Sequence, residues 1–162
     1  MVIGSLISQK SILICFFCLA SIACDKGKEV SEYKVKEKID HYWPRLVASD
    51  SLELAQFDVC QLLPGSGWDR AYVVHPYMTL DQLRKLDLNN FSSVEDEFRH
   101  FRSSDFQEGF LFVKNQDIVS YSISNRRLNF DNVSSFTKEE CQNLLIKRYA
   151  PDGTAYFHVA LK

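Results

Sequence analysis

The sequence predicts an α+β domain with a largely antiparallel sheet. Helical patterns come early in the chain, whereas strand patterns dominate after Gly109. No strand-helix-strand repetition is found, and such repetition is typical of a parallel sheet. The length of 162 residues and the apolar content of 46% suit one globular domain. We therefore expect an N-terminal helix, then two short helices between early and late strands.

The first expected element is a helix at about 29–43, which presents a Lys/Glu face to solvent. Pro44 lacks a backbone N–H and restricts the preceding residue, so the regular helix is expected to end or kink near Tyr42. The apolar side of this helix recurs at helical spacing and comprises Val35, Ile39, Tyr42, Trp43 and Leu46.

Two early strands are expected at 54–62 and 70–75. The first has an alternating apolar pattern, and the second contains Tyr72 followed by two Val residues. The Pro-Gly-Ser-Gly sequence at 64–67 between them has the composition of a loop. Pro76 cannot donate a backbone hydrogen bond to a sheet and should end the second strand.

Two short helices should follow. Thr79 is placed to cap a helix that runs through Leu86, with Asp81 in its first turn. The second helix is expected from residues 92 or 93 to 101, with Val94 and Phe98 on its apolar edge.

Two hairpins are expected in the last third of the chain. The first joins 110–114 to 118–123 through a turn at 115–117, and the second joins 144–149 to 154–160 through 151–153. The Asp-Gly pair in the second turn is a strong hairpin signal.

The first 23 residues have the pattern of a secretory signal peptide. Lys10 precedes a 13-residue apolar run, which is shorter than the roughly 20 residues that span a membrane as a helix. This segment resembles a bacterial lipoprotein signal, because Cys24 follows Ala23 at its end, although Ser21 stands where Leu is usual. The resemblance implies cleavage before Cys24 and acylation of this residue; the alternatives are plain cleavage after Ala23 or an uncleaved anchor.

This organisation divides the chain into a signal peptide (1–23), a lipid-attached tether (24–28) and one α+β domain (29–162). The chain from Cys24 onward carries 18 basic and 21 acidic residues, a net charge of −3. Such a balance disfavours nucleic acid as a partner. The expected location is the bacterial cell envelope, held to a membrane by lipid. Asp25 after the cysteine resembles an inner-membrane retention signal of some bacteria, but the choice between inner and outer membrane stays open.

The sequence lacks the common motifs for phosphate, dinucleotide, metal or serine-nucleophile sites. We therefore expect no metal, no organic cofactor and no enzymatic activity. Cys60 and Cys141 lie 81 residues apart and are expected either to be bonded to each other or to be buried as small apolar residues.

The most unusual run surrounds the second expected strand. Trp68 and Asp69 precede the strand, and Tyr77 follows it. These residues are expected to form one structural corner, in which Trp68 packs, Asp69 accepts hydrogen bonds from turn N–H groups and Tyr77 staples the next helix. The alternative is a binding lip, because aromatic residues are frequent anchors at interfaces.

This run resembles small bacterial envelope lipoproteins of uncharacterised function. The shared pattern is Trp68-Asp69-Arg70, an aromatic-aliphatic strand at 72–74, the Pro-Tyr pair at 76–77 and a later apolar strand at 111–114 that ends in Val-Lys. The likeness spans about residues 54–161 and implies no activity. His75 departs from it, since an apolar or small residue is expected there.

Together these observations lead us to expect a non-enzymatic, lipid-anchored domain that binds a protein or another envelope component. One alternative is an immunity or inhibitor lipoprotein that neutralises a toxic or lytic enzyme. A second alternative is a small hydrolase that uses Asp69 or His75; a cluster of these with another acid in an open pocket would favour it.

Overall fold

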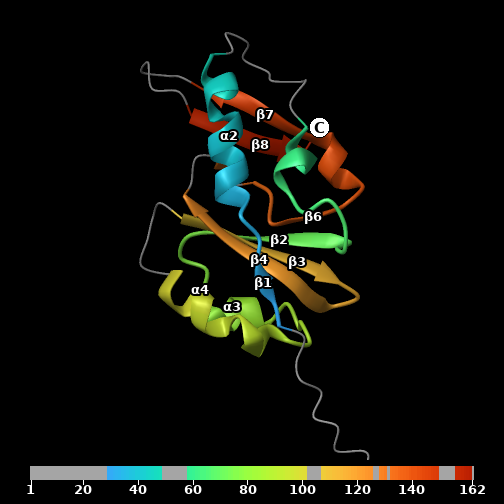
Figure 1. Cartoon of the computed structure of the whole chain (residues 1–162). Coiled ribbons are helices and arrows are strands. Elements are labelled where there is room, and N and C mark those ends of the chain that lie inside the picture. Colours follow the sequence, from blue (N-terminus) through green and yellow to red (C-terminus); the bar gives the residue numbers. More distant parts are fainter. Residues whose placement is uncertain are drawn as a thin grey trace, which may run out of the picture.

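The computed structural model describes residues 29–48, 58–101, 107–125, 128–130, 132–149 and 156–161. These residues form three layers (Figure 1), with a five-stranded sheet in the middle. Helices α3 and α4 lie on one face of this sheet, and helix α2 and a three-stranded sheet lie on the other. The expected α+β class is confirmed. None of the helices in the described part is long and apolar enough to cross a membrane.

The five-stranded sheet has the order β1-β4-β3-β2-β6. Strands β4, β3, β2 and β6 pair antiparallel with their neighbours, whereas β1 pairs parallel with β4 at one edge. The sheet is therefore largely antiparallel, as expected. Its strands are β1 (Ser31–Glu32), β2 (Arg70–Val74), β3 (Gln107–Lys114), β4 (Asp117–Asn125) and β6 (Ser135–Thr137).

The smaller sheet has the order β5-β8-β7. Strands β7 (Leu144–Tyr149) and β8 (Tyr156–Leu161) pair antiparallel, which confirms the pairing expected for the last hairpin, and the turn expected at 151–153 lies outside the described residues. Strand β5 (Leu128–Asn129) adds to β8 in the parallel sense.

Each face of the larger sheet buries its own apolar cluster. Strand β3 supplies both, because successive side chains of a strand point to opposite faces. Phe110 and Phe112 pack toward α2 and the smaller sheet, whereas Leu111 and Val113 pack toward α3 and α4. At Gly109 an added Cβ atom would lie 2.6 Å from the ring of Phe98 in α4, so glycine permits this close approach of helix and strand.

The first helix lies later in the chain than the sequence indicates. Helix α2 spans Val35–Val47 and includes Pro44, so the expectation of a helix at 29–43 is wrong at both ends. Residues 31–32 are instead taken up by β1. Proline removes one helical hydrogen bond, but continuation beyond it buries Leu46 to 2% exposure. Burial of this apolar face outweighs the local cost of the proline.

The strand expected at 54–62 is wrong where the structure describes it. Val59–Leu62 form a short 3₁₀ helix, η1, and residues 54–57 lie outside the described part. The Asp58 side chain accepts a hydrogen bond from the amide of Cys60 at 2.9 Å and begins this turn. The spacing of three residues places Val59 and Leu62 on the same side of the 3₁₀ turn, and both are buried.

The two short helices are confirmed. Helix α3 (Leu80–Arg84) is capped by Thr79. The Thr79 hydroxyl accepts a hydrogen bond from the backbone N–H of Gln82, and the Gln82 side chain accepts one from the backbone N–H of Thr79. This reciprocal pair is a capping box. The second helical segment consists of a 3₁₀ turn, η2 (Phe91–Ser93), followed by α4 (Glu95–Phe101).

The first hairpin is also confirmed. Strands β3 and β4 are joined by Asn115 and Gln116, which have φ angles of 51° and 68°. Two consecutive residues with positive φ are typical of the two-residue turn that matches the twist of paired strands. Across β4, the Asn90 side chain donates to the carbonyl of Ile118 and accepts from its amide, at 2.9 Å and 2.7 Å. These two bonds fix the chain where it leaves the turn and enters β4.

Candidate functional site

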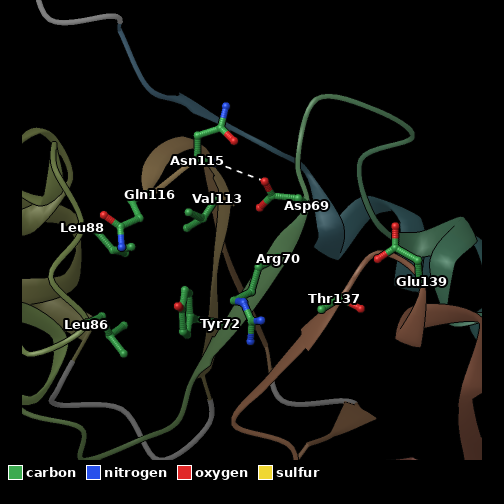
Figure 2. Close-up of a pocket in the computed structure, with 10 residues that line it drawn as sticks. All are labelled: Asp69, Arg70, Tyr72, Leu86, Leu88, Val113, Asn115, Gln116, Thr137 and Glu139. Carbon is green, nitrogen blue, oxygen red and sulfur yellow. Dashed lines mark hydrogen bonds between the residues drawn. The ribbon is translucent and has the colours of Figure 1, made fainter.

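An open groove of about 410 Å³ lies at the end of the larger sheet where the β3–β4 turn is located (Figure 2). Four parts of the chain contribute to it: the start of β2, the end of β3 with its turn, the segment after α3, and the end of β6. The lining residues are Asp69, Arg70, Tyr72, Leu86, Leu88, Val113, Asn115, Gln116, Thr137 and Glu139.

Alternation along β2 divides its residues between the groove and the core. Arg70 and Tyr72 line the groove, whereas Ala71 and Val73 are buried against the opposite face. This division follows from the two-residue period of a strand. Tyr72 also packs on the apolar cluster beneath α3 and α4, so the floor of the groove is continuous with that cluster.

Asp69 braces the turn that forms one wall. Its Oδ2 accepts the backbone N–H of Asn115 at 3.2 Å, and the amide of Asp69 itself donates to the carbonyl of Val113 at 2.9 Å. Asp69 therefore accepts a hydrogen bond from a turn N–H group, although the turn is that of the next hairpin and not its own loop.

Arg70 is the cation of the groove. Its side chain is exposed and forms no salt bridge or hydrogen bond with the residues that the structure describes. Arg84 on α3 differs, because it pairs with Asp81 at 2.9 Å and with Glu95 at 2.6 Å. The hydrogen bond and charge of Glu95 raise the pKa of Arg84 above its usual value. The guanidinium of Arg70 thus has its donors open to a ligand.

Trp68 belongs to the core and not to the groove. Its side chain is 5% exposed, and its indole N–H donates to the carbonyl of Pro64 at 2.6 Å. The ring lies 5.7 Å from Phe112 and 6.2 Å from Phe136, and Lys138 Nζ is 5.9 Å from its centroid. These contacts give Trp68 the packing role expected of a corner residue.

Tyr77 does not join Trp68 and Asp69 in one corner. It follows β2, whereas the other two residues precede it, and the five residues of this extended strand separate them by roughly 17 Å. Tyr77 is 68% exposed and has a φ angle of 71°. The single corner is therefore wrong, because an extended strand cannot bring its two ends together.

Cys60 and Cys141 form a disulfide with a Cα–Cα separation of 5.6 Å. It links η1 to η3 (Glu140–Asn143), the 3₁₀ turn that follows β6. Thr137 and Glu140 form a reciprocal pair of hydrogen bonds, each side chain accepting the other's amide, at the entrance to η3. The disulfide thus anchors the segment that carries Thr137 and Glu139 into the groove.

A second polar arrangement, which the sequence did not indicate, lies beyond the other end of β2. Glu108 on β3 is 1% exposed, and its Oε1 lies 3.5 Å from Nδ1 of His75. The same oxygen accepts the amide of Phe130 at 3.3 Å. His75 thus has a buried carboxylate as a neighbour. The pair is largely enclosed, unlike the groove.

Among the residues described, no group of three or more His, Cys, Asp or Glu side chains is placed to hold a metal ion. Cys24 and the signal peptide lie outside the described residues, so the expected acylation stays a prediction.

Comparison of the chain with protein-family models, with curated proteins and with solved structures finds no match. The resemblance to small envelope lipoproteins therefore stays a prediction, and the function has to be argued from the groove itself.

The sequence did not indicate the groove, although Arg70 belongs to the unusual run that surrounds β2. The sequence does contain a local signal for an exposed sheet face. A charged residue begins the strand, and it shares a face with the aromatic residue two positions later. The remaining walls come from distant segments and have no such local signal.

Proposed function

We propose that the protein is a lipid-anchored domain of the bacterial cell envelope that binds a protein or another envelope component through the groove. The observation that carries this proposal is the guanidinium of Arg70, which has no salt-bridge or hydrogen-bond partner among the described residues and lies beside the apolar side chains of Tyr72, Leu86 and Leu88. Binding sites commonly combine an apolar surface with a few polar groups that fix orientation.

The proposed anchor would hold the groove close to the membrane. Strand β1 runs parallel to β4 with Ser31 opposite Ser120, so the chain enters the sheet at the end where β4 begins. The β3–β4 turn, which lines the groove, lies at that same end. Acylated Cys24 would be five residues from Glu29, a reach of about 17 Å at most. A partner in or near the membrane surface would meet the groove directly.

A binding role is supported over hydrolysis by how the acids of the groove are used. Asp69 and Glu139 both line it, which is the clustering that would favour a hydrolase. One oxygen of Asp69, however, accepts the hydrogen bond of the turn, and an exposed arginine occupies the same groove. His75, the other candidate, neighbours Glu108 and does not line the groove.

Site-specific photo-crosslinking of the full chain in its native cell tests the proposal. A crosslinker at Gln116, on the exposed rim of the groove, should capture a partner, whereas one at exposed Glu37 on α2 should not. Capture should be lost in Arg70→Gln and retained in Arg84→Gln. Equal capture from Gln116 and Glu37, or capture that is unchanged in Arg70→Gln, would contradict binding through the groove. A captured lytic enzyme would indicate the inhibitor alternative.

The anchor is tested separately by the intact mass of membrane-extracted protein. We expect loss of residues 1–23 and added acyl mass on Cys24, and Cys24→Ala should release the protein from membranes. Several acyl chains bind a bilayer far more firmly than one, at about 0.8 kcal/mol per buried CH₂. An unmodified Cys24 or a retained signal peptide would refute the anchor.

A further inference from the structure

We propose that the groove recognises an acidic side chain on a segment of a partner protein, with its carboxylate paired to Arg70 and a neighbouring aliphatic side chain placed against Leu86 and Leu88. This inference rests on the proposed binding function and adds the chemistry of the ligand. It is drawn from the charges of the groove, the arrangement of its walls and the state of its edge strand.

The charges favour a single carboxylate. The guanidinium of Arg70, which is unpaired within the described part of the chain, offers two parallel N–H donors that match the two oxygens of a carboxylate. Asp69 and Glu139 line the same groove and leave it with one net negative charge. A dianionic phosphate doubles the attraction to Arg70 as well as the repulsion from the two acids, so the net negative charge of the groove opposes it about twice as strongly as it opposes a monoanion. The groove therefore selects a weakly charged anion over phosphate groups.

The walls separate apolar from polar contacts. In Figure 2, Leu86 and Leu88 lie on one side of Arg70 beyond the ring of Tyr72, and Thr137 and Glu139 lie on the other side. A ligand whose carboxylate meets Arg70 thus has an apolar surface within reach on one side only. Leu86 provides most of this surface, since Leu88 is 8% exposed and belongs to the cluster beneath α3 and α4. A segment that contains an acidic residue next to an aliphatic residue can contact both Arg70 and this apolar surface.

The exposure of the groove favours a protein segment over a free small acid. Arg70 and Glu139 are both exposed, whereas pockets for small molecules typically bury about 70–90% of the ligand surface. A short acid bound here would stay largely in water. A protein segment continues past the groove and gains contacts outside it.

Addition of the partner as a further strand is disfavoured at this point of the edge. The outward N–H of Thr137 in β6 already donates to the Glu140 carboxylate at 2.7 Å. Strand addition requires such groups to be open to the incoming backbone. Recognition should therefore depend on side chains, above all on the Arg70 contact.

The experiment uses the full-length protein in lipid nanodiscs with ¹³C-labelled leucine methyl groups. Leu86 and Leu88 report on the groove, and Leu46 and Leu62, buried on the other face of the sheet, serve as internal references. The probes are the peptides acetyl-Leu-Glu-Leu-amide and acetyl-Leu-Gln-Leu-amide, together with N-acetyl-leucine as a free small acid.

We expect the Glu peptide to shift the Leu86 and Leu88 signals saturably and to bind about two- to fivefold more tightly than the Gln peptide, the size expected for an ion pair with an exposed arginine. Arg70→Gln should remove this preference, and Arg84→Gln should keep it. Equal binding of the two peptides, or a preference that survives in Arg70→Gln, overturns the inference. N-acetyl-leucine binding as tightly as the Glu peptide overturns the choice of a protein segment.

The outcome also separates this inference from the proposed function. Absence of binding by the Glu peptide, together with crosslinks at Gln116 that depend on Arg70, would overturn the acidic segment and leave the binding role in place. Absence of both results would overturn both proposals.

Discussion

Replacement of Trp68 by alanine should destabilise the domain by about 4 kcal/mol. Its side chain is 5% exposed and lies against Phe112 and Phe136 between the two sheets. Truncation of a buried Trp costs about 3–5 kcal/mol, and the indole hydrogen bond to Pro64, worth about 1 kcal/mol, is part of that loss. Neighbouring rings have little freedom to fill the space, because they belong to the same packed cluster.

Equilibrium unfolding in urea, followed by circular dichroism, measures this change. With a slope of about 2 kcal/mol per molar urea, typical of a small domain, the midpoint should fall by about 2 M. Trp68→Phe keeps an aromatic ring but leaves the Pro64 carbonyl without this donor, and we expect an intermediate loss. Tyr77→Ala is the matched control at the exposed end of β2 and should change the stability by less than about 0.5 kcal/mol.

A midpoint shift below about 0.5 M for Trp68→Ala would refute the assignment of Trp68 to the core. Loss of partner crosslinking with unchanged stability would instead restore the binding lip. Equal effects of Trp68→Ala and Tyr77→Ala would mean that the two residues act together, contrary to their separation by β2.

Three further perturbations follow from other parts of the fold. Denatured, unreduced protein should contain no free thiol from Cys60 or Cys141, and the double alanine variant should lose about 2–4 kcal/mol, since the bond closes a long loop; a thiol assay and urea unfolding check both. Glu108→Leu should cost about 1–3 kcal/mol in urea unfolding, because it leaves a buried amide without its acceptor; an unchanged midpoint would contradict this. Burial raises the pKa of Tyr33. The stabilisation that this side chain contributes is therefore complete below the unfolded pKa of about 10, and it is lost as the pH rises through the folded pKa. Unfolding measured between pH 8 and 11 should show a smaller loss of stability at alkaline pH in Tyr33→Phe than in the unmodified protein.

The elements that the sequence predicted well carry their signals locally. The capping box of α3 and the two-residue turn between β3 and β4 are complete within a few positions, and Pro76 ends β2 by its own chemistry. The first helix was misplaced because its boundaries depend on tertiary contacts. Residues 31–32 pair with β4 as strand β1 and are therefore not helical. Burial of Leu46 favours continuation of the helix beyond Pro44.

The groove shows why a site can escape sequence reasoning even when its central residue belongs to a noticed motif. Trp68, Asp69 and Arg70 are consecutive, yet they meet the core, the β3–β4 turn and the groove respectively. How far each of them is exposed in the groove depends on where β2 begins and which face α3 and α4 cover. The apolar wall and the far rim come from segments that follow α3 and β6, and the Cys60–Cys141 bond anchors the second of these segments. A motif therefore indicated that this strand is special, but only the pairing of strands distant in the chain places Arg70 in the groove and Trp68 in the core.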